Sequence, residues 1–82
     1  MVSAVDDLRA EALFCSDLQP SDRPSREAID QAVTAMLLAY ATEGCAGHVA
    51  QEFGDHPEQA ATRMRWCMTA VVYGVFAIAG TR

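Results

Sequence analysis

Lysine is absent from this 82-residue chain, and all six basic residues are arginines. The 11 acidic residues outnumber them, so the formal net charge is −5. An acidic, lysine-free composition argues against non-specific nucleic-acid binding by the whole surface. Acids dominate as far as Asp30, whereas the balance turns slightly positive from Asp55 onward. Any nucleic-acid contact is therefore expected to be local and small.

Cysteine is scarce and irregularly spaced. The three residues Cys15, Cys45 and Cys67 are odd in number, which argues against a disulfide framework and favours a reducing compartment. A bridge from Cys15 to Cys45 or Cys67 would require Cα atoms within about 7 Å. Met1 leads into an acidic stretch and not into the basic and apolar run of a secretory signal, so we expect a cytoplasmic protein.

A metal site is poorly supported by the sequence. Cys45 and His48 have the Cys-x-x-His spacing of one zinc-ligand pair, and His48 and Glu52 are four residues apart. A structural zinc site needs four ligands and usually two recognisable pairs. His56 and Cys67 are further candidates but do not form a second pair. We therefore expect no metal and no cofactor.

The usual signatures of catalysis are also missing. The chain carries no glycine-rich phosphate loop and no paired-carboxylate motif, and nothing in the sequence orients a Cys–His nucleophile pair. A chain of this length has little room for a substrate cavity beside a core. We therefore expect a protein that is not an enzyme.

The sequence pattern predicts one compact all-α domain over residues 1–82. Apolar residues make up 51% of the chain, and no stretch shows strand alternation. We expect four helices, at about residues 4–18, 26–43, 45–53 and 56–79. The core of such a short chain is near the lower limit for independent stability, so association would help to cover its apolar surface.

Caps and apolar stripes place the first two helices. Ser3 and Ser25 are favourable N-caps because a serine side chain accepts from N–H groups of the first helical turn. Phe14 and Leu18 are the expected anchors of the first helix. The second helix carries an apolar stripe of Ile29, Val33, Met36, Leu37 and Tyr40. This stripe predicts a largely buried, central helix that ends at Gly44.

The stretch from Val49 to Trp66 predicts two helices joined by a tight turn. Gly54 is expected to adopt φ > 0 and end the first of them. Asp55 then serves as N-cap, Pro57 falls in the first turn, and Glu58 completes a capping box. Two helices joined by a three- to four-residue turn containing glycine form a helix-turn-helix-like unit.

The spacing around this turn carries a family resemblance. An alanine precedes the turn glycine by four residues, and a small apolar residue, an arginine and an aliphatic residue follow it by six, nine and ten: these are Ala50, Gly54, Ala60, Arg63 and Met64. This pattern resembles the C-terminal, promoter-reading helix-turn-helix of sigma factors. Glu43-Gly44 upstream also resembles the Glu-Gly pair that closes the preceding helix in that family, although the gap to the turn is one residue shorter here. The resemblance covers residues 25–66. The Glu-Phe-Gly-Asp-His-Pro and Arg-Met-Arg-Trp runs are also similar to small uncharacterised actinobacterial proteins, which implies no function.

The sigma-factor resemblance implies that the helix from His56 enters the DNA major groove. Gln59, Thr62 and Arg63 would then face base edges, with His56 and Arg65 near phosphates. The chain would be a small regulator contacting DNA or the transcription machinery. The alternative is a helical protein-interaction module or dimeric accessory subunit without nucleic-acid contact. A positive patch around Arg63 and Arg65 would favour the first reading, and an apolar groove would favour the second.

The C-terminal helix carries no charge from residue 67 to residue 79. The side chains spaced to face the protein's own core are Met64, Cys67, Val71, Val75 and Ile78. Further apolar residues lie outside that stripe, so the helix is apolar nearly all round. The run is shorter than the roughly 20 residues that cross a bilayer, so we expect no membrane span.

The second apolar face predicts an interface. Val72, Tyr73 and Phe76 are the expected anchors, and Ala70 and Gly74 have a small-x-x-x-small spacing that lets another helix approach closely. We therefore predict a homodimer, or docking on a larger protein partner, through this helix. The alternative is that the first helix covers this face within one chain.

Overall fold

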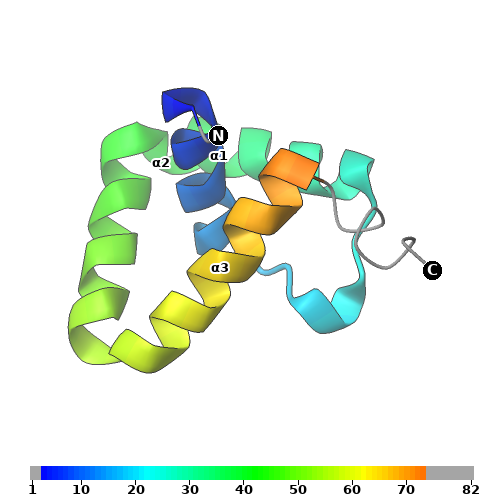
Figure 1. The fold of residues 1–82 in the computed structure, drawn as a ribbon. Coiled ribbons are helices and arrows are strands. Elements are labelled where there is room, and N and C mark those ends of the chain that lie inside the picture. Colours follow the sequence, from blue (N-terminus) through cyan, green and yellow to red (C-terminus); the bar gives the residue numbers. More distant parts are fainter. Residues whose placement is uncertain (1–2, 74–82) are drawn as a thin grey trace.

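A computed structural model describes residues 3–73, which form three α-helices and one short 3₁₀ turn (Figure 1). In chain order the elements are α1 (Ala4–Cys15), η1 (Pro20–Asp22), α2 (Arg26–Asp55) and α3 (Pro57–Tyr73). Residues 3–73 contain no strand. The described part of the chain is therefore all-α and compact, with α2 and α3 both packed against α1.

The ends of α1 are set by two serines. The Ser3 hydroxyl accepts from the Asp6 N–H at 3.1 Å, and the Asp6 carboxylate accepts from the Ser3 N–H at 3.4 Å, which completes a capping box. At the other end, Ser16 is extended, and its N–H and hydroxyl both donate to the Leu13 carbonyl, at 3.0 and 2.7 Å. The N-cap prediction is confirmed. The helix ends at Cys15, before the predicted Leu18, because Ser16 takes up a last-turn carbonyl.

α2 is longer than the sequence predicted. Ser25 caps it as expected, since its hydroxyl accepts from the Ala28 N–H at 3.1 Å. The predicted end at Gly44 is wrong, because the helix is interrupted at Ala41, where φ is 59° and ψ is 177°. α2 therefore consists of two helical segments, residues 26–40 and 42–55, which correspond to the expected second and third helices with their boundary three residues earlier.

Gly44 has a packing role beside this kink. A Cβ added there would lie 3.0 Å from the Cβ of Tyr40, closer than side chains normally pack. Glycine is therefore needed at this position for the close approach of the chain on either side of Ala41. Gly44 thus matters because it lacks a side chain, and not because it adopts a left-handed backbone conformation.

The junction of α2 and α3 also differs from the prediction. Gly54 is not in the left-handed region, and Asp55 is the last residue of α2 and not the N-cap of the next helix. His56 alone joins the two helices: its N–H donates to the Glu52 carbonyl at 2.7 Å, and its carbonyl accepts from the Ala60 N–H at 2.8 Å. Because His56, at φ −140° and ψ 67°, makes the reversal, no positive-φ glycine is required.

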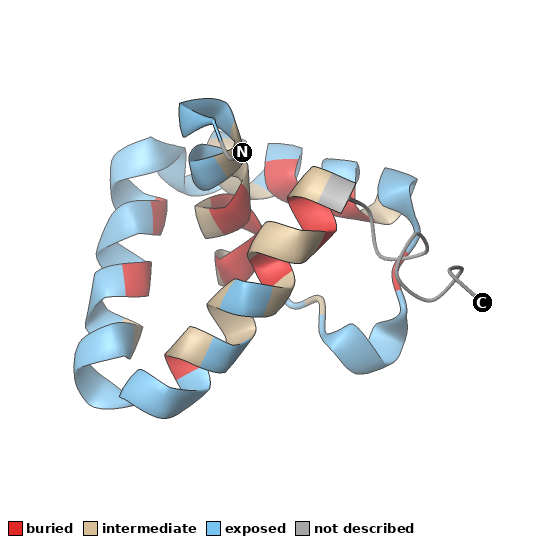
Figure 2. Ribbon diagram, viewed as in Figure 1, coloured by how far each residue is buried: buried red, intermediate tan, exposed pale blue. Residues whose placement is uncertain are grey.

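The core is centred on α1 (Figure 2). Ala10, Ala12 and Leu13 are completely buried, and Phe14 is nearly so. The prediction of Phe14 as an anchor is confirmed, but Leu13 was not identified from the sequence. α1 occupies this position because the other two helices pack on different sides of it.

The prediction that the second helix is central and largely buried is wrong. α2 contributes the buried residues Ile29, Val33, Cys45 and Val49. Farther along the predicted stripe, Tyr40 is 58% exposed, and the neighbouring Leu38 is 83% exposed. The first segment of α2 leaves the core as it approaches the kink, so its last turn faces solvent.

α3 packs on α1 through the face that the sequence predicted. Cys67 and Val71 are buried and Met64 is partly buried, whereas Val75 and Ile78 lie outside the described residues. Arg9 of α1 links all three helices, since its Nη1 donates to the Val71 carbonyl at 3.4 Å and its Nη2 donates to Asp30 Oδ1 at 2.5 Å.

Candidate functional site

Arg63 reaches from α3 to the C-terminal end of α1. Its Nε donates to the Phe14 carbonyl at 3.0 Å, and its Nη2 donates to the carbonyls of Ser16 at 2.9 Å and Leu13 at 3.3 Å. The last carbonyls of a helix lack partners within the helix and carry partial negative charge, so a cation there is favourable. The last turn of α1 contains no basic residue of its own. α3 therefore supplies the cationic C-cap of α1.

Two aromatic rings lie close to the same guanidinium. Its Cζ lies 5.5 Å from the Phe14 ring centroid and 5.7 Å from that of Trp66, both within cation–π range. Nη1 is buried, and no acceptor among residues 3–73 pairs with it. The sequence assigned Arg63 to DNA bases. In the structure its hydrogen bonds are directed into the protein, because the end of α1 lies within its reach.

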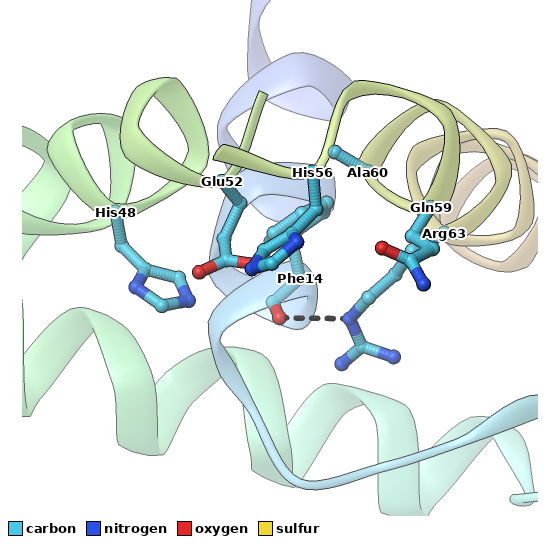
Figure 3. A pocket seen from close by; sticks show the side chains of 7 residues that line it. All are labelled: Phe14, His48, Glu52, His56, Gln59, Ala60 and Arg63. Carbon is cyan, nitrogen blue, oxygen red and sulfur yellow. Dashed lines mark hydrogen bonds between the residues drawn. The ribbon is translucent and has the colours of Figure 1, made fainter. Parts of the chain in front are cut away.

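Two pockets adjoin Arg63 on the α3 side. The first, which we call the histidine pocket, has a volume of about 390 Å³ and is lined by Phe14, His48, Glu52, His56, Gln59, Ala60 and Arg63 (Figure 3). The second, the tryptophan pocket, has a volume of about 540 Å³ and is lined by Gln19, Pro20, Glu58, Gln59, Thr62, Arg63 and Trp66. The two pockets share Gln59 and Arg63.

The structure brings most of the predicted nucleic-acid residues together around these pockets. His56, Gln59 and Thr62 are exposed there, next to the half-buried Arg63. Each pocket also has a glutamate in its wall, Glu52 in the first and Glu58 in the second. The electrostatic environment is therefore mixed, and not the strongly positive patch that attracts a phosphate backbone.

Arg65 lies at the edge of this cluster, where it contacts Thr62 and lines an apolar groove. The groove has a volume of about 440 Å³ and is lined by Phe53, Ala61, Met64, Arg65, Met68 and Thr69; we call it the methionine groove. The Arg65 Nη2 donates to Thr62 Oγ1 at 3.3 Å, and its carbonyl accepts from Thr69 Oγ1 at 2.8 Å. Both bonds stay within α3, so the Arg65 charge remains exposed at the groove edge.

The groove spans the junction of α2 and α3. Phe53, near the end of α2, is 37% exposed, and Met64 and Met68 of α3 are partly exposed. The sequence analysis did not single out this surface. The signal was the spacing of Ala61, Met64 and Met68 along one face of α3, but Phe53 joins it only because His56 folds α2 back beside α3.

The predicted interface on the C-terminal helix is described in part. Ala70 is 3% exposed and belongs to the protein's own core, because α1 covers that face; it is therefore not free to receive a second helix. Val72 is half-buried against the core. Tyr73 is the last residue of α3, and Gly74 and Phe76 lie outside the described residues.

Cys15, Cys45 and Cys67 are free thiols. The Cys15 Sγ donates to the Cys45 carbonyl at 3.5 Å, so these two residues are neighbours. Burial, together with the neighbouring Cys45 and Glu11, raises the pKa of Cys15 to about 12, and Arg63 opposes them. Burial likewise raises the pKa of Cys67 to about 12, against a lowering effect of Arg63. Both thiols are therefore protonated at neutral pH.

The residues that were weighed as zinc ligands do not lie together. Within residues 3–73, no three side chains of His, Cys, Asp or Glu are placed as metal ligands would be. Cys45 is buried, whereas His48 is exposed and its ring packs edge-on against Phe14, with centroids 6.1 Å apart. The Cys45 side chain thus lies in the core, whereas the His48 side chain lines the histidine pocket.

Comparison with protein-family models, curated proteins and solved structures finds no match for this chain. None of the helices in residues 3–73 is long and apolar enough to cross a membrane.

Proposed function

We propose that this protein is a helical protein-interaction module that binds an amphipathic helix of a partner in the methionine groove. The observation that carries the proposal is the apolar hollow beside Arg65, at a position where a DNA reader would present a positive patch. Exposed apolar surface gathered in a hollow is typical of interaction sites. Methionine side chains are flexible and adapt to apolar partners, as in other helix-binding grooves.

The spacing of the groove residues along α3 suits a partner helix. Ala61, Met64 and Met68 follow one another at i, i+3 and i+7 on α3, and Phe53 forms the opposite wall. A partner helix lying along α3 would place its own apolar residues at the same spacing between these side chains. Thr69 and Arg65 would face the polar edge of that helix.

Charge complementarity favours a basic partner. The chain has a net charge of −5, so its overall field attracts a basic partner, while the charged residue in the groove wall itself is Arg65. Opposite charges across an interface speed association and set orientation. We therefore expect the partner helix to carry Lys or Arg on either side of its apolar stripe.

A synthetic amphipathic Leu/Lys helix tests this proposal. Labelled peptide is titrated with the protein and followed by fluorescence polarisation at about 0.05 and 0.2 M salt, where screening differs strongly. We expect saturable binding that weakens at the higher salt and is lost in Met68→Glu. Leu38→Glu is the matched control because Leu38 is exposed outside the groove. No binding by the wild type, or equal loss in both variants, would reject the groove.

A second copy of the chain is the other proposed partner. Homodimerisation would use the predicted anchors Val72 and Tyr73 at the end of α3 and Phe76, which lies outside the described residues. Sedimentation of the wild type at micromolar concentrations, compared with Tyr73→Glu, separates the cases. A dimer dissociated by Tyr73→Glu but not by Met68→Glu supports self-association outside the groove. A monomer at every concentration rejects homodimerisation.

DNA contact through the start of α3 remains a second proposal for function. It is supported by the exposure of Gln59, Thr62 and Arg65 on one helix, with His56 beside its first turn. In this proposal the chain is a small helix-turn-helix-like regulator in which Gln59 and Thr62 face base edges and His56 and Arg65 lie near phosphates. Arg63 is given a structural role and not a base contact.

The DNA proposal is tested with duplex fragments in the same polarisation assay. Gln59→Ala and Arg65→Ala are the informative variants, since Arg63→Ala would also remove the cap of α1. Binding that weakens in both variants and falls steeply with salt is expected for phosphate and base contacts. A wild type that binds no fragment at about 0.05 M salt would exclude this function.

A further inference from the structure

We propose that Cys15 is an oxidation site, and that a hydroperoxide converts Cys15 and Cys45 into an intramolecular disulfide. The two residues are 30 positions apart in the chain, at the end of α1 and just after the kink of α2. The Cys15 Sγ nevertheless lies 3.5 Å from the backbone carbonyl oxygen of Cys45. The packing of α1 on α2 therefore places one sulfur against the backbone that carries the other.

The surroundings give the two thiols different roles. Cys15 is half-buried and lines a pocket of about 190 Å³ together with Tyr40, Gly44 and His48. A water molecule occupies roughly 30 Å³ of liquid volume, so this pocket admits a reagent as small as hydrogen peroxide. Cys45 is 1% exposed and does not line the pocket. Peroxide therefore meets Cys15 first, and Cys45 acts as the resolving thiol.

Neither sulfur is held by a strong bond. Cys45 Sγ donates to the Met36 carbonyl at 3.9 Å, and Cys15 Sγ makes the contact with the Cys45 carbonyl. Thiols are weak hydrogen-bond donors, so rotation about either Cα–Cβ bond requires little energy. The proposed bridge therefore requires side-chain rotation at Cys15 or Cys45, starting from the contact between the Cys15 sulfur and the Cys45 carbonyl.

The chemistry takes two steps. The Cys15 thiolate attacks one peroxide oxygen, the O–O bond breaks, and the departing hydroxide takes the thiol proton to leave as water. The Cys45 sulfur then attacks the sulfenic sulfur of Cys15, the S–O bond breaks, and a second water leaves with the Cys45 proton. Two thiols and one hydrogen peroxide thus give one disulfide and two waters, with two electrons passing from sulfur to oxygen.

The rate of the first step depends on pH. Burial and the neighbouring Cys45 and Glu11 keep Cys15 protonated, with a pKa of about 12, and Arg63 of α3 opposes them. His48 of α2 is the other titratable group in the pocket wall. Since the thiolate is the nucleophile, its fraction and the oxidation rate rise about tenfold per pH unit below that pKa. The reaction of Cys15 with peroxide at neutral pH is therefore slow.

The test is intact-mass analysis and peptide mapping of the wild-type protein after treatment with hydrogen peroxide at pH 7 and pH 8. We expect a monomer that has lost two hydrogens, a linked peptide joining Cys15 to Cys45, faster conversion at pH 8, and reversal by a thiol reductant. Cys67→Ala should behave like the wild type, while Cys15→Ala and Cys45→Ala should lose the species. The wild-type map decides the outcome even where a variant folds poorly.

Several results would overturn the proposal. Linkage of Cys67 to either partner, disulfide dimers in place of the internal bridge, or oxidation that stops at sulfinic acid on Cys15 would each show that Cys45 does not resolve it. Absence of any oxidation of Cys15 would show that the pocket does not admit peroxide.

Discussion

Arg63 and Phe14 touch in two ways: the Arg63 Nε donates to the Phe14 carbonyl at 3.0 Å, and the Arg63 Cζ lies 5.5 Å from the Phe14 ring centroid. The same side chain of Arg63 thus satisfies the backbone of α1 and packs against its main aromatic anchor. The two residues are 49 positions apart, so this contact exists only when α1 and α3 are in place. Substitution of Arg63 therefore tests how much the packing of α3 on α1 contributes to stability.

Arg63→Ala is expected to lower the free energy of unfolding by about 2–4 kcal/mol, since it removes charge-assisted hydrogen bonds to helix carbonyls and two cation–π contacts. Arg63→Lys should retain the charge at the helix end but lose the forked geometry, and so fall between alanine and wild type. Urea unfolding measures both. Arg65→Ala is the control, since that exposed side chain bonds only within α3. An equal loss in Arg65→Ala would contradict the capping role of Arg63.

Gly44→Ala and Gly47→Ala form a matched pair within the second segment of α2. Alanine favours a helix over glycine by roughly 0.5–1 kcal/mol, so Gly47→Ala, whose new Cβ meets no atom within 4 Å, should be stabilising by about that amount. At Gly44 the new Cβ would lie 3.0 Å from Tyr40 Cβ, and that crowding should cancel or reverse the gain. Thermal unfolding of the two variants checks the order. Equal stabilisation would show that the kink has room for a methyl group.

Ala41→Gly should have the opposite effect to most alanine-to-glycine changes in helices. Ala41 sits at φ 59°, a region that glycine adopts readily and alanine does not. Relief of strain of about 1–2 kcal/mol is offset in part by the greater freedom of glycine in the unfolded chain. We therefore expect a melting temperature equal to or above that of the wild type. A clear decrease would mean that residue 41 is helical in solution.

Stability is expected to fall as the pH rises from about 9 to about 12, in part because of Cys67. Its pKa is about 12 in the folded protein and 9.0 ordinarily. Between these values the unfolded chain loses the proton that the folded protein keeps, so the unfolded state is favoured by up to about 1.4 kcal/mol per pH unit. Urea unfolding at pH 8, 9 and 10 should show a shallower decline in Cys67→Ala. An equal loss of stability with pH in the wild type and Cys67→Ala would show that Cys67 does not contribute to it.

The sequence predicted the features that depend on neighbouring residues. Ser3 and Ser25 cap helices because hydroxyl and backbone lie within three positions of each other, and both caps are present. Cys67 and Val71 face the core, as the spacing along α3 indicated. These features can be predicted because they depend only on residues within about one helical turn of each other.

The features that the sequence did not reveal depend on contacts between distant segments. Nothing in the sequence around Ala41 predicts its positive φ. Glycine is the residue that usually adopts positive φ, yet neither Gly44 nor Gly54 does so here. Arg63 looked like an exposed base-reading residue because the end of α1 is remote in sequence.

The central position of α1 has a consequence for synthesis on the ribosome. α1 is translated before α2 and α3, yet its buried face packs against both of them. A helix of 12 residues is marginal by itself in water, and its cap at Arg63 follows Phe14 by 49 residues. At roughly 5–20 residues per second, α1 waits about 2–10 seconds for that cap to be made. The first helix of the chain is therefore completed last, and its apolar face is the surface most in need of protection while translation proceeds.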